Sequence, residues 1–116
     1  MTAAADEQAA AWTVVCRYDD LQPERGVAAL IGATQIALFR LFDGTLRAIG
    51  NQDPFTGAFV LSRGLVGSRE EVPTVASPLH KQVFDLRTGA CLDDETVAVP
   101  SYPARARHGL VEVMAG

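Results

Sequence analysis

The apolar residues of this chain fall into short runs that are separated by turn-forming residues. β-branched and aromatic residues dominate the run over 12–18, and further apolar runs cover 27–31 and 35–42. The run over 35–42 is apolar on both alternating faces except at Arg40, a pattern typical of a strand that is covered on both sides. The chain is therefore expected to be built from β-strands.

Two dipeptides predict hairpins. Asp43-Gly44 lies between two strand-like runs, and both residue types tolerate the positive φ angles of a type I′ turn. His108-Gly109 lies at the centre of a second predicted hairpin over 104–114, in which apolar and polar residues alternate after the turn. The sequence thus predicts one antiparallel pair in the first half of the chain and one at its C-terminus.

The middle of the chain differs in composition from the segments on either side. Residues 51–71 are rich in Gly, Pro and Ser, which predicts an irregular segment, yet they hold too many apolar side chains for disorder, so the segment is expected to be packed. Strands are predicted over 72–76 and 82–86, with a break at Ser77-Pro78. Any helix is expected to be no longer than one or two turns, within 21–26 or 56–62.

Residues 1–10 are Ala-rich and polar without periodicity, which predicts a disordered or frayed N-terminal tail. A length of 116 residues allows one domain, predicted over 11–116, and leaves no room for a separate cofactor domain. The net charge of −4 argues against a nucleic-acid partner, because phosphate binding requires a clustered basic surface. No apolar run approaches the roughly 20 residues of a membrane span. The N-terminus carries acids instead of the basic start of a signal peptide, so a cytoplasmic location is expected.

Two segments carry the most information about chemistry. They resemble the Rieske iron–sulfur domain, in which one loop carries Cys-x-His, a later loop carries Cys-x-x-His, and a strand reading Phe-Asp-Leu follows. Asp53 and Phe55 stand at the first pair of ligand positions, Ser77 and His80 stand at the second pair, and the strand reads Phe-Asp-Leu over 84–86. The resemblance implies an all-β Rieske-like sandwich or barrel with two loop-bearing hairpins at the former cluster tip.

Of those four positions, only His80 keeps a residue that could bind the cluster. Asp53 and Ser77 offer hard oxygen donors and Phe55 offers none, whereas a [2Fe–2S] cluster takes thiolate and imidazole ligands. No cluster, other cofactor, metal or catalytic group is therefore expected on this chain. His80 is expected to make a loop-packing or interface hydrogen bond and not to transfer protons.

The same motifs, together with the segments 60–67 and 84–94, resemble the small subunit of the assimilatory NAD(P)H-dependent nitrite reductase. The likeness runs from about residue 12 to residue 114. It implies a non-catalytic accessory subunit that functions in nitrate assimilation. It also implies a large partner subunit that carries FAD, siroheme and a [4Fe–4S] centre and reduces nitrite to ammonium.

Two other functions share the predicted fold. One is a Rieske-type ferredoxin that carries electrons with unusual ligands, and the other is a stand-alone β-sandwich binding module. For the accessory subunit, the loop tip becomes a docking surface in place of a redox surface. The phenylalanines of the tip either dock or fill the space of the lost cluster, and both readings stay open. The candidate contact residues are Phe55, Phe59, Leu79, His80 and Lys81.

Overall fold

The computed structural model describes residues 12–115, so the predicted tail over 1–10 lies outside the described residues. These residues form short antiparallel strands and single 3₁₀ turns, in agreement with the predicted all-β class. In chain order the elements are β1 (Trp12–Arg17), η1 (Tyr18–Asp20), β2 (Gly26–Ile31), β3 (Thr34–Arg40), β4 (Leu46–Gly50), η2 (Leu61–Arg63), β5 (Leu65–Arg69), β6 (Val72–Ala76), β7 (Val83–Asp85), β8 (Ser101–Tyr102), β9 (Ala104–Arg107) and β10 (Leu110–Met114).

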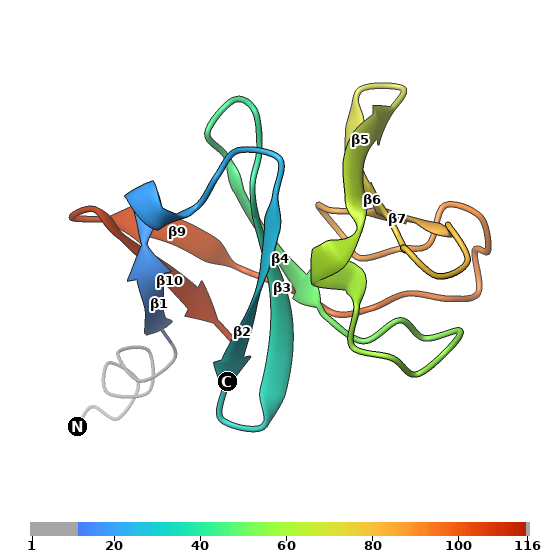
Figure 1. Ribbon diagram of the computed structural model, residues 1–116, viewed down its shortest axis with the longest axis horizontal. Coiled ribbons are helices and arrows are strands. Elements are labelled where there is room, and N and C mark those ends of the chain that lie inside the picture. The colour runs from blue at the N-terminus through green and yellow to red at the C-terminus, as the bar shows by residue number, and fades with distance from the viewer. Residues whose placement is uncertain (1–11, 116) are drawn as a thin grey trace, which may run out of the picture.

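The strands form three small sheets. Their orders are β1-β10-β9, β2-β3-β4-β8 and β5-β6-β7. Figure 1 shows the first sheet on the left, the second in the centre and the third on the right. The central sheet therefore has a neighbour on each side, as the predicted sandwich requires.

β3 confirms the prediction of a strand covered on both sides. Ile36, Ala37, Leu38 and Phe39 are all 0% exposed. Since neighbouring side chains of a strand point to opposite faces, Ile36 and Leu38 enter one core, while Ala37 and Phe39 enter the other. The two cores are thus separated by the central sheet.

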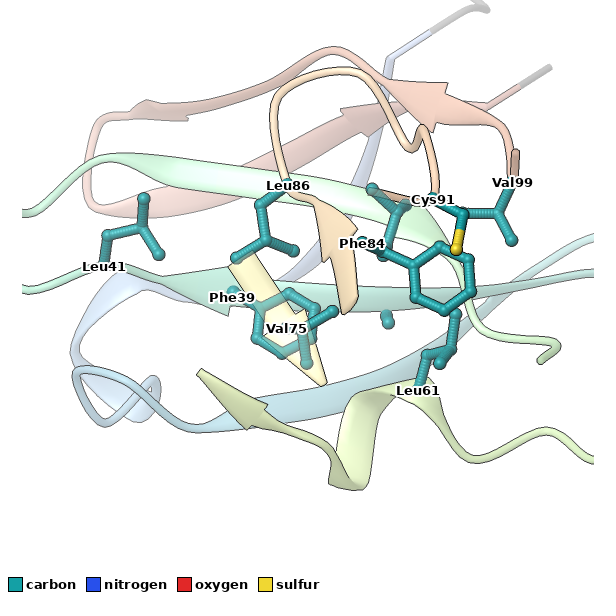
Figure 2. Packing of buried hydrophobic residues seen from close by; sticks show 10 residues of the cluster. Phe39, Leu41, Leu61, Val75, Phe84, Leu86, Cys91 and Val99 are labelled. Atoms are coloured by element: carbon teal, nitrogen blue, oxygen red, sulfur yellow. The ribbon is translucent and has the colours of Figure 1, made fainter. Parts of the chain in front are cut away.

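The first core lies toward the third sheet and toward the loops that follow it. Figure 2 shows Phe84 close to Cys91 and Leu61 within this cluster. Its buried residues are Ala37, Phe39, Leu41, Ile49, Leu61, Val75, Phe84, Leu86, Cys91 and Val99. The second core is built by the opposite face of β3 and β4 together with Leu21, Val111 and Val113. The third sheet and its loops therefore rest on a core of their own.

The hairpin predictions are confirmed in their positions, and one is wrong in its turn type. β9 and β10 pair across His108-Gly109, whose φ angles of 55° and 78° are both positive. At Asp43-Gly44 only Gly44, with φ of 90°, is left-handed, and the Leu41 N–H donates to the Thr45 carbonyl at 2.8 Å. This is a three-residue loop with glycine at its left-handed position, so the predicted type I′ turn is wrong there.

The prediction of an irregular segment over 51–71 is wrong in its second half. Residues 65–69 form β5, which pairs with β6 in a hairpin. The turn of this hairpin is Glu70-Glu71, with φ angles of 53° and 70°, although glutamate does not favour the left-handed region. The sequence did not predict this strand because most of β5 is exposed and Gly67 interrupts its apolar pattern.

Candidate functional site

The first of the two predicted ligand loops follows β4 and covers residues 53–58. The Asp53 N–H donates to the Ala58 carbonyl at 2.8 Å, and the Gly57 N–H donates to the Asp53 carbonyl at 2.7 Å. The Asp53 carboxylate folds back inside this first loop, where Oδ1 accepts the Phe55 N–H at 2.8 Å. Gly57 has φ of 80°, which glycine adopts at little cost. The first loop is thus a closed turn whose shape is fixed by Asp53.

The second loop joins β6 to β7 over residues 77–82 and repeats the same bonding pattern. The Ser77 N–H donates to the Gln82 carbonyl at 2.9 Å, and the Lys81 N–H donates to the Ser77 carbonyl at 3.0 Å. The Ser77 Oγ accepts the Leu79 N–H at 3.3 Å. Lys81 takes the left-handed place that Gly57 holds in the first loop, with φ of 65°. The two loops thus share one backbone hydrogen-bond frame.

A direct side-chain hydrogen bond joins the two loops. The Ser77 hydroxyl donates to Asp53 Oδ2 at 2.5 Å. Both residues are buried, with exposed fractions of 1% for Ser77 and 0% for Asp53. The Asp53 carboxylate therefore accepts one hydrogen bond on each oxygen, as a buried polar group requires. The residues at the two cysteine positions thus hold the loops together by hydrogen bonding.

The donor set at these four positions does not fit a [2Fe–2S] cluster. The side-chain oxygens of Asp53 and Ser77 form hydrogen bonds with each other and with backbone N–H groups. Phe55 has no atom that could bind a metal. His80 alone retains a suitable donor, whereas the cluster needs four ligands, Cys or His. Among residues 12–115, no three His, Cys, Asp or Glu side chains gather in a metal-binding arrangement.

The two cysteines belong to neither of the two loops. Cys16 is on β1, where burial, with the Asp20 charge adding to it, raises the pKa of its thiol. Cys91 is 3% exposed and packs in the first core beside Phe84, as Figure 2 shows. Both thiols are free. Neither stands at one of the four ligand positions.

The predicted contact residues are exposed in the two loops and, for Phe59, directly after the first loop. Phe55, Phe59 and Leu79 are 38%, 49% and 48% exposed, and His80 and Lys81 are also exposed. We call these five residues the loop tip. The ring of Phe55 lies 6.4 Å from the ring of Phe84, so one side of it covers the core while the other faces outward. His80 is exposed, and the hydrogen bond expected of it, in loop packing or at an interface, stays a prediction.

A third loop with the same frame begins at the last residue of β7 and covers residues 85–90. The Asp85 N–H donates to the Ala90 carbonyl at 2.8 Å, and the Gly89 N–H donates to the Asp85 carbonyl at 2.7 Å. Asp85 Oδ1 accepts the Arg87 N–H at 2.7 Å, and the Arg87 guanidinium pairs with the same carboxylate. Burial raises the pKa of Asp85, but the hydrogen bonds and charge of Arg87 outweigh it, so the pKa lies below its ordinary value.

Asn51 is a positioning residue that the sequence analysis did not identify. It is 1% exposed, its Oδ1 accepts the Ser62 N–H at 2.7 Å, and its Nδ2 donates to Gln35 Oε1 at 3.3 Å. These bonds anchor the start of the first loop to η2 and β3. The only signal in the sequence is a single Asn directly after an apolar run, which is also a common turn residue.

Comparisons with known proteins agree with this geometry. Residues 11–114 match the model of the Rieske-like [2Fe-2S] domain family. The nitrite reductase (NADH) small subunit of Escherichia coli K12 is 45% identical over 103 residues, which covers 88% of this chain and 95% of the relative. A crystal structure from Mycobacterium tuberculosis, described as an NADH-dependent nitrite reductase small subunit, has a TM-score of 0.88 and 51% identity, and covers 90% of this chain and 95% of its own.

A longer relative shows the same domain in another setting. The nitrite reductase [NAD(P)H] large subunit of Klebsiella oxytoca is 40% identical over 102 residues, which covers 88% of this chain but 11% of the relative. That large subunit therefore contains a segment similar to almost the whole of this chain. Within residues 12–115, none of the helices has the length and apolar character of a membrane span.

Proposed function

We propose that this chain, which belongs to the Rieske-like [2Fe-2S] domain family and within it to the nitrite reductase small subunits, is the accessory subunit of a cytoplasmic NAD(P)H nitrite reductase. It docks to the large catalytic subunit and supplies no catalytic group of its own. The large subunit is proposed to carry FAD, siroheme and a [4Fe–4S] centre and to reduce nitrite to ammonium in nitrate assimilation.

The domain inside the Klebsiella large subunit supports the choice of partner. Joining two domains in one polypeptide holds them together at a high effective concentration. Separate chains need a docking surface to stay together. The same domain occurs as a separate chain and as a segment of a large subunit. This occurrence is best explained if the separate chain binds the large subunit. This favours the accessory subunit over a stand-alone binding module.

The hydrogen bond between Ser77 and Asp53 is the observation that carries the proposal of a cluster-free subunit. A Rieske ferredoxin needs thiolates where these two side chains stand, and their buried oxygens are already satisfied by each other and by loop N–H groups. The bond also supplies what a cluster would supply mechanically, a link between the two loops. We therefore propose that the tip keeps its shape without iron and does not carry electrons.

The loop tip is proposed as the docking surface. Phe55 and Leu79 expose apolar area on loops whose backbones are fixed by the hydrogen bonds described above, and Phe59 is exposed directly after the first loop. Preformed apolar anchors lose little conformational entropy when a partner covers them, which is the usual property of interface hot spots. Phe55 packs on Phe84 and still presents an open face, so filling the core and docking are compatible roles.

Co-purification with the large subunit tests the docking surface. A variant with Phe55→Asp and Leu79→Ser is expected to lose at least about ten-fold in affinity, because each replacement removes an apolar anchor. Leu30→Ser is the matched control, since Leu30 is 68% exposed on β2, away from the loops. The proposal is wrong if the tip variant keeps its fold by circular dichroism and binds as well as the control.

Iron content separates the accessory subunit from the ferredoxin. The purified chain is expected to be colourless and to hold no stoichiometric iron after anaerobic exposure to iron and sulfide. The variant Asp53→Cys, Phe55→His, Ser77→Cys serves as the positive control, since with His80 it completes the Rieske donor set. Two irons per chain in the unmodified protein would establish the ferredoxin reading instead.

A further inference from the structure

A groove separate from the loop tip lies between the β3–β4 turn and the β5–β6 hairpin. In Figure 1 both of these segments extend toward the top, whereas the chain that follows β4 lies at lower right. The groove has a volume of about 430 Å³. It is lined by Glu24, Leu41, Phe42, Asp43, Val66, Gly67, Ser68, Glu71 and Pro73. Its wall is therefore partly apolar, and its charged groups are all acids.

Phe42 is the most exposed large apolar residue of the described chain, at 87%. Glu24, Asp43 and Glu71 line the same groove, and the described lining includes no Lys or Arg. Glu24 Oε2 accepts the Phe42 N–H at 2.9 Å, which fixes that carboxylate next to the aromatic residue. Hydrogen bonds from Thr45, with the Arg47 charge adding to them, hold the pKa of Asp43 below its ordinary value. An exposed aromatic side chain thus shares the groove with three acidic residues.

The chain itself shows which side chain suits such a combination. The guanidinium of Arg105 lies 3.9 Å from the centre of the Trp12 ring, and its Nε donates to Glu112 Oε1 at 2.6 Å. One arginine is thereby held by an aromatic face and a carboxylate together. This pairing is favourable because the ring quadrupole and the carboxylate attract the same planar cation. The groove presents the same two groups without an arginine of its own.

The glutamates of the groove are also held in an unfavourable backbone conformation. Glu24 and Glu71 have φ angles of 67° and 70°, in the left-handed region that is unfavourable for a non-glycine residue. Glycine would relieve that cost at either position but would remove the carboxylate. Strained residues persist more often at binding sites than elsewhere. The left-handed Glu24 thus places a carboxylate in the groove, whereas at Glu71 the turn of the β5–β6 hairpin uses the left-handed region, as it does at Glu70.

We propose that this groove receives an arginine-bearing segment of the large subunit, with the guanidinium over Phe42 and between the carboxylates of Glu24 and Glu71. The proposal rests on the proposed function, because it gives the same partner a second contact, away from the loop tip. The charge of the groove supports this occupant, since an acidic or uncharged apolar segment would leave the carboxylates desolvated and unpaired.

The test measures binding of the full-length chain to the purified large subunit at low and at high salt. Phe42→Ser is expected to raise Kd by at least roughly five-fold, as for the loss of an aromatic anchor. Glu71→Gly is expected to raise Kd by roughly two- to five-fold at low salt and less at high salt, as for one exposed ion pair.

Glu70→Gly is the matched control. Glu70 is the neighbouring turn residue, it also has a positive φ of 53°, and it does not line the groove. Both glycine variants remove one negative charge and relieve one left-handed residue, so both are expected to raise the denaturation midpoint. Only Glu71→Gly is expected to weaken binding. A loss of affinity in a more stable protein cannot come from unfolding.

The outcomes distinguish this inference from the proposed function. If the unmodified chain binds, the loop-tip variant binds weakly and the groove variants bind normally, the groove inference is overturned and the proposed function stands. Equal losses for Glu70→Gly and Glu71→Gly also overturn it, because they indicate a general effect of charge. If the unmodified chain does not bind the large subunit at all, the proposed function fails, and the inference fails with it.

Discussion

Replacement of Ser77 by alanine removes the link between the two loops. The hydroxyl is lost as a donor to Asp53 Oδ2 at 2.5 Å and as an acceptor for the Leu79 N–H at 3.3 Å. The second bond is long and lies at a half-exposed residue, so water replaces it at little cost. The first leaves one oxygen of a carboxylate that is 0% exposed without a donor.

The expected cost follows from that unsatisfied oxygen. A hydrogen bond to a charged group contributes about 1.5–3 kcal/mol, and a buried polar group left without its partner costs a similar amount. We expect Ser77→Ala to lower the free energy of unfolding by about 2–3 kcal/mol, a large share of the roughly 5–15 kcal/mol that stabilises a typical domain. Urea unfolding followed by circular dichroism, with Ser68→Ala on exposed β5 as the control, measures it.

A double-mutant cycle shows whether the pair is responsible. Asp53→Ala combined with Ser77→Ala removes both partners, so the double variant is expected to lose less than the sum of the single losses, by at least about 1 kcal/mol. Additive losses, or a loss below about 0.5 kcal/mol for Ser77→Ala, would refute the reasoning that this bond holds the loops together.

Three further predictions concern the repeated loop frame. Lys81→Gly is expected to raise the unfolding free energy by about 0.5–1 kcal/mol, because it relieves a φ of 65°, whereas Gly57→Ala, at φ of 80°, is expected to lower it by about 1–2 kcal/mol; urea midpoints measure both. Gly89→Ala is expected to cost about 2–4 kcal/mol in the same assay, since its Cβ would lie 2.0 Å from the Val99 carbonyl oxygen. The folded-state pKa of Asp85 is lowered, so its contribution to stability is present above its unfolded pKa of about 3.9 and is lost as pH falls through the folded value. Asp85→Asn is therefore expected to flatten the loss of stability below about pH 4, and an unchanged acid profile would contradict this.

The strands with strong local patterns could be predicted from the sequence. β6 was expected over 72–76 and has those bounds, and β3 was expected to be covered on both faces because its apolar run does not alternate. Each of these signals lies within a few neighbouring residues. The turn type at Asp43-Gly44 was not predictable in the same way, because the choice between a two- and a three-residue loop depends on which residues of β3 and β4 pair.

The candidate site could be located but not understood from the sequence. The ligand spacing placed Asp53 and Ser77 at the two loops, and the chemistry of their side chains argued against iron. Their mutual hydrogen bond joins residues far apart in the chain and depends on how β4 and β6 are brought together by the first core. The frame shared with the loop that begins at Asp85 was likewise hidden, because it is a pattern of backbone bonds and not of residue types.

The β3–β4 pair separates two cores, and this separation affects how the domain responds to amino-acid substitutions. The loop-bearing half rests on one side of that ribbon, while β10 and its neighbours cover the other side with a distinct set of side chains. A substitution at the loops is therefore expected to disturb the packing of the first core and to leave the second core packed. Such a division would allow the loop-bearing half to exchange an inorganic centre for the proposed protein contact while the packing of the other half stays the same.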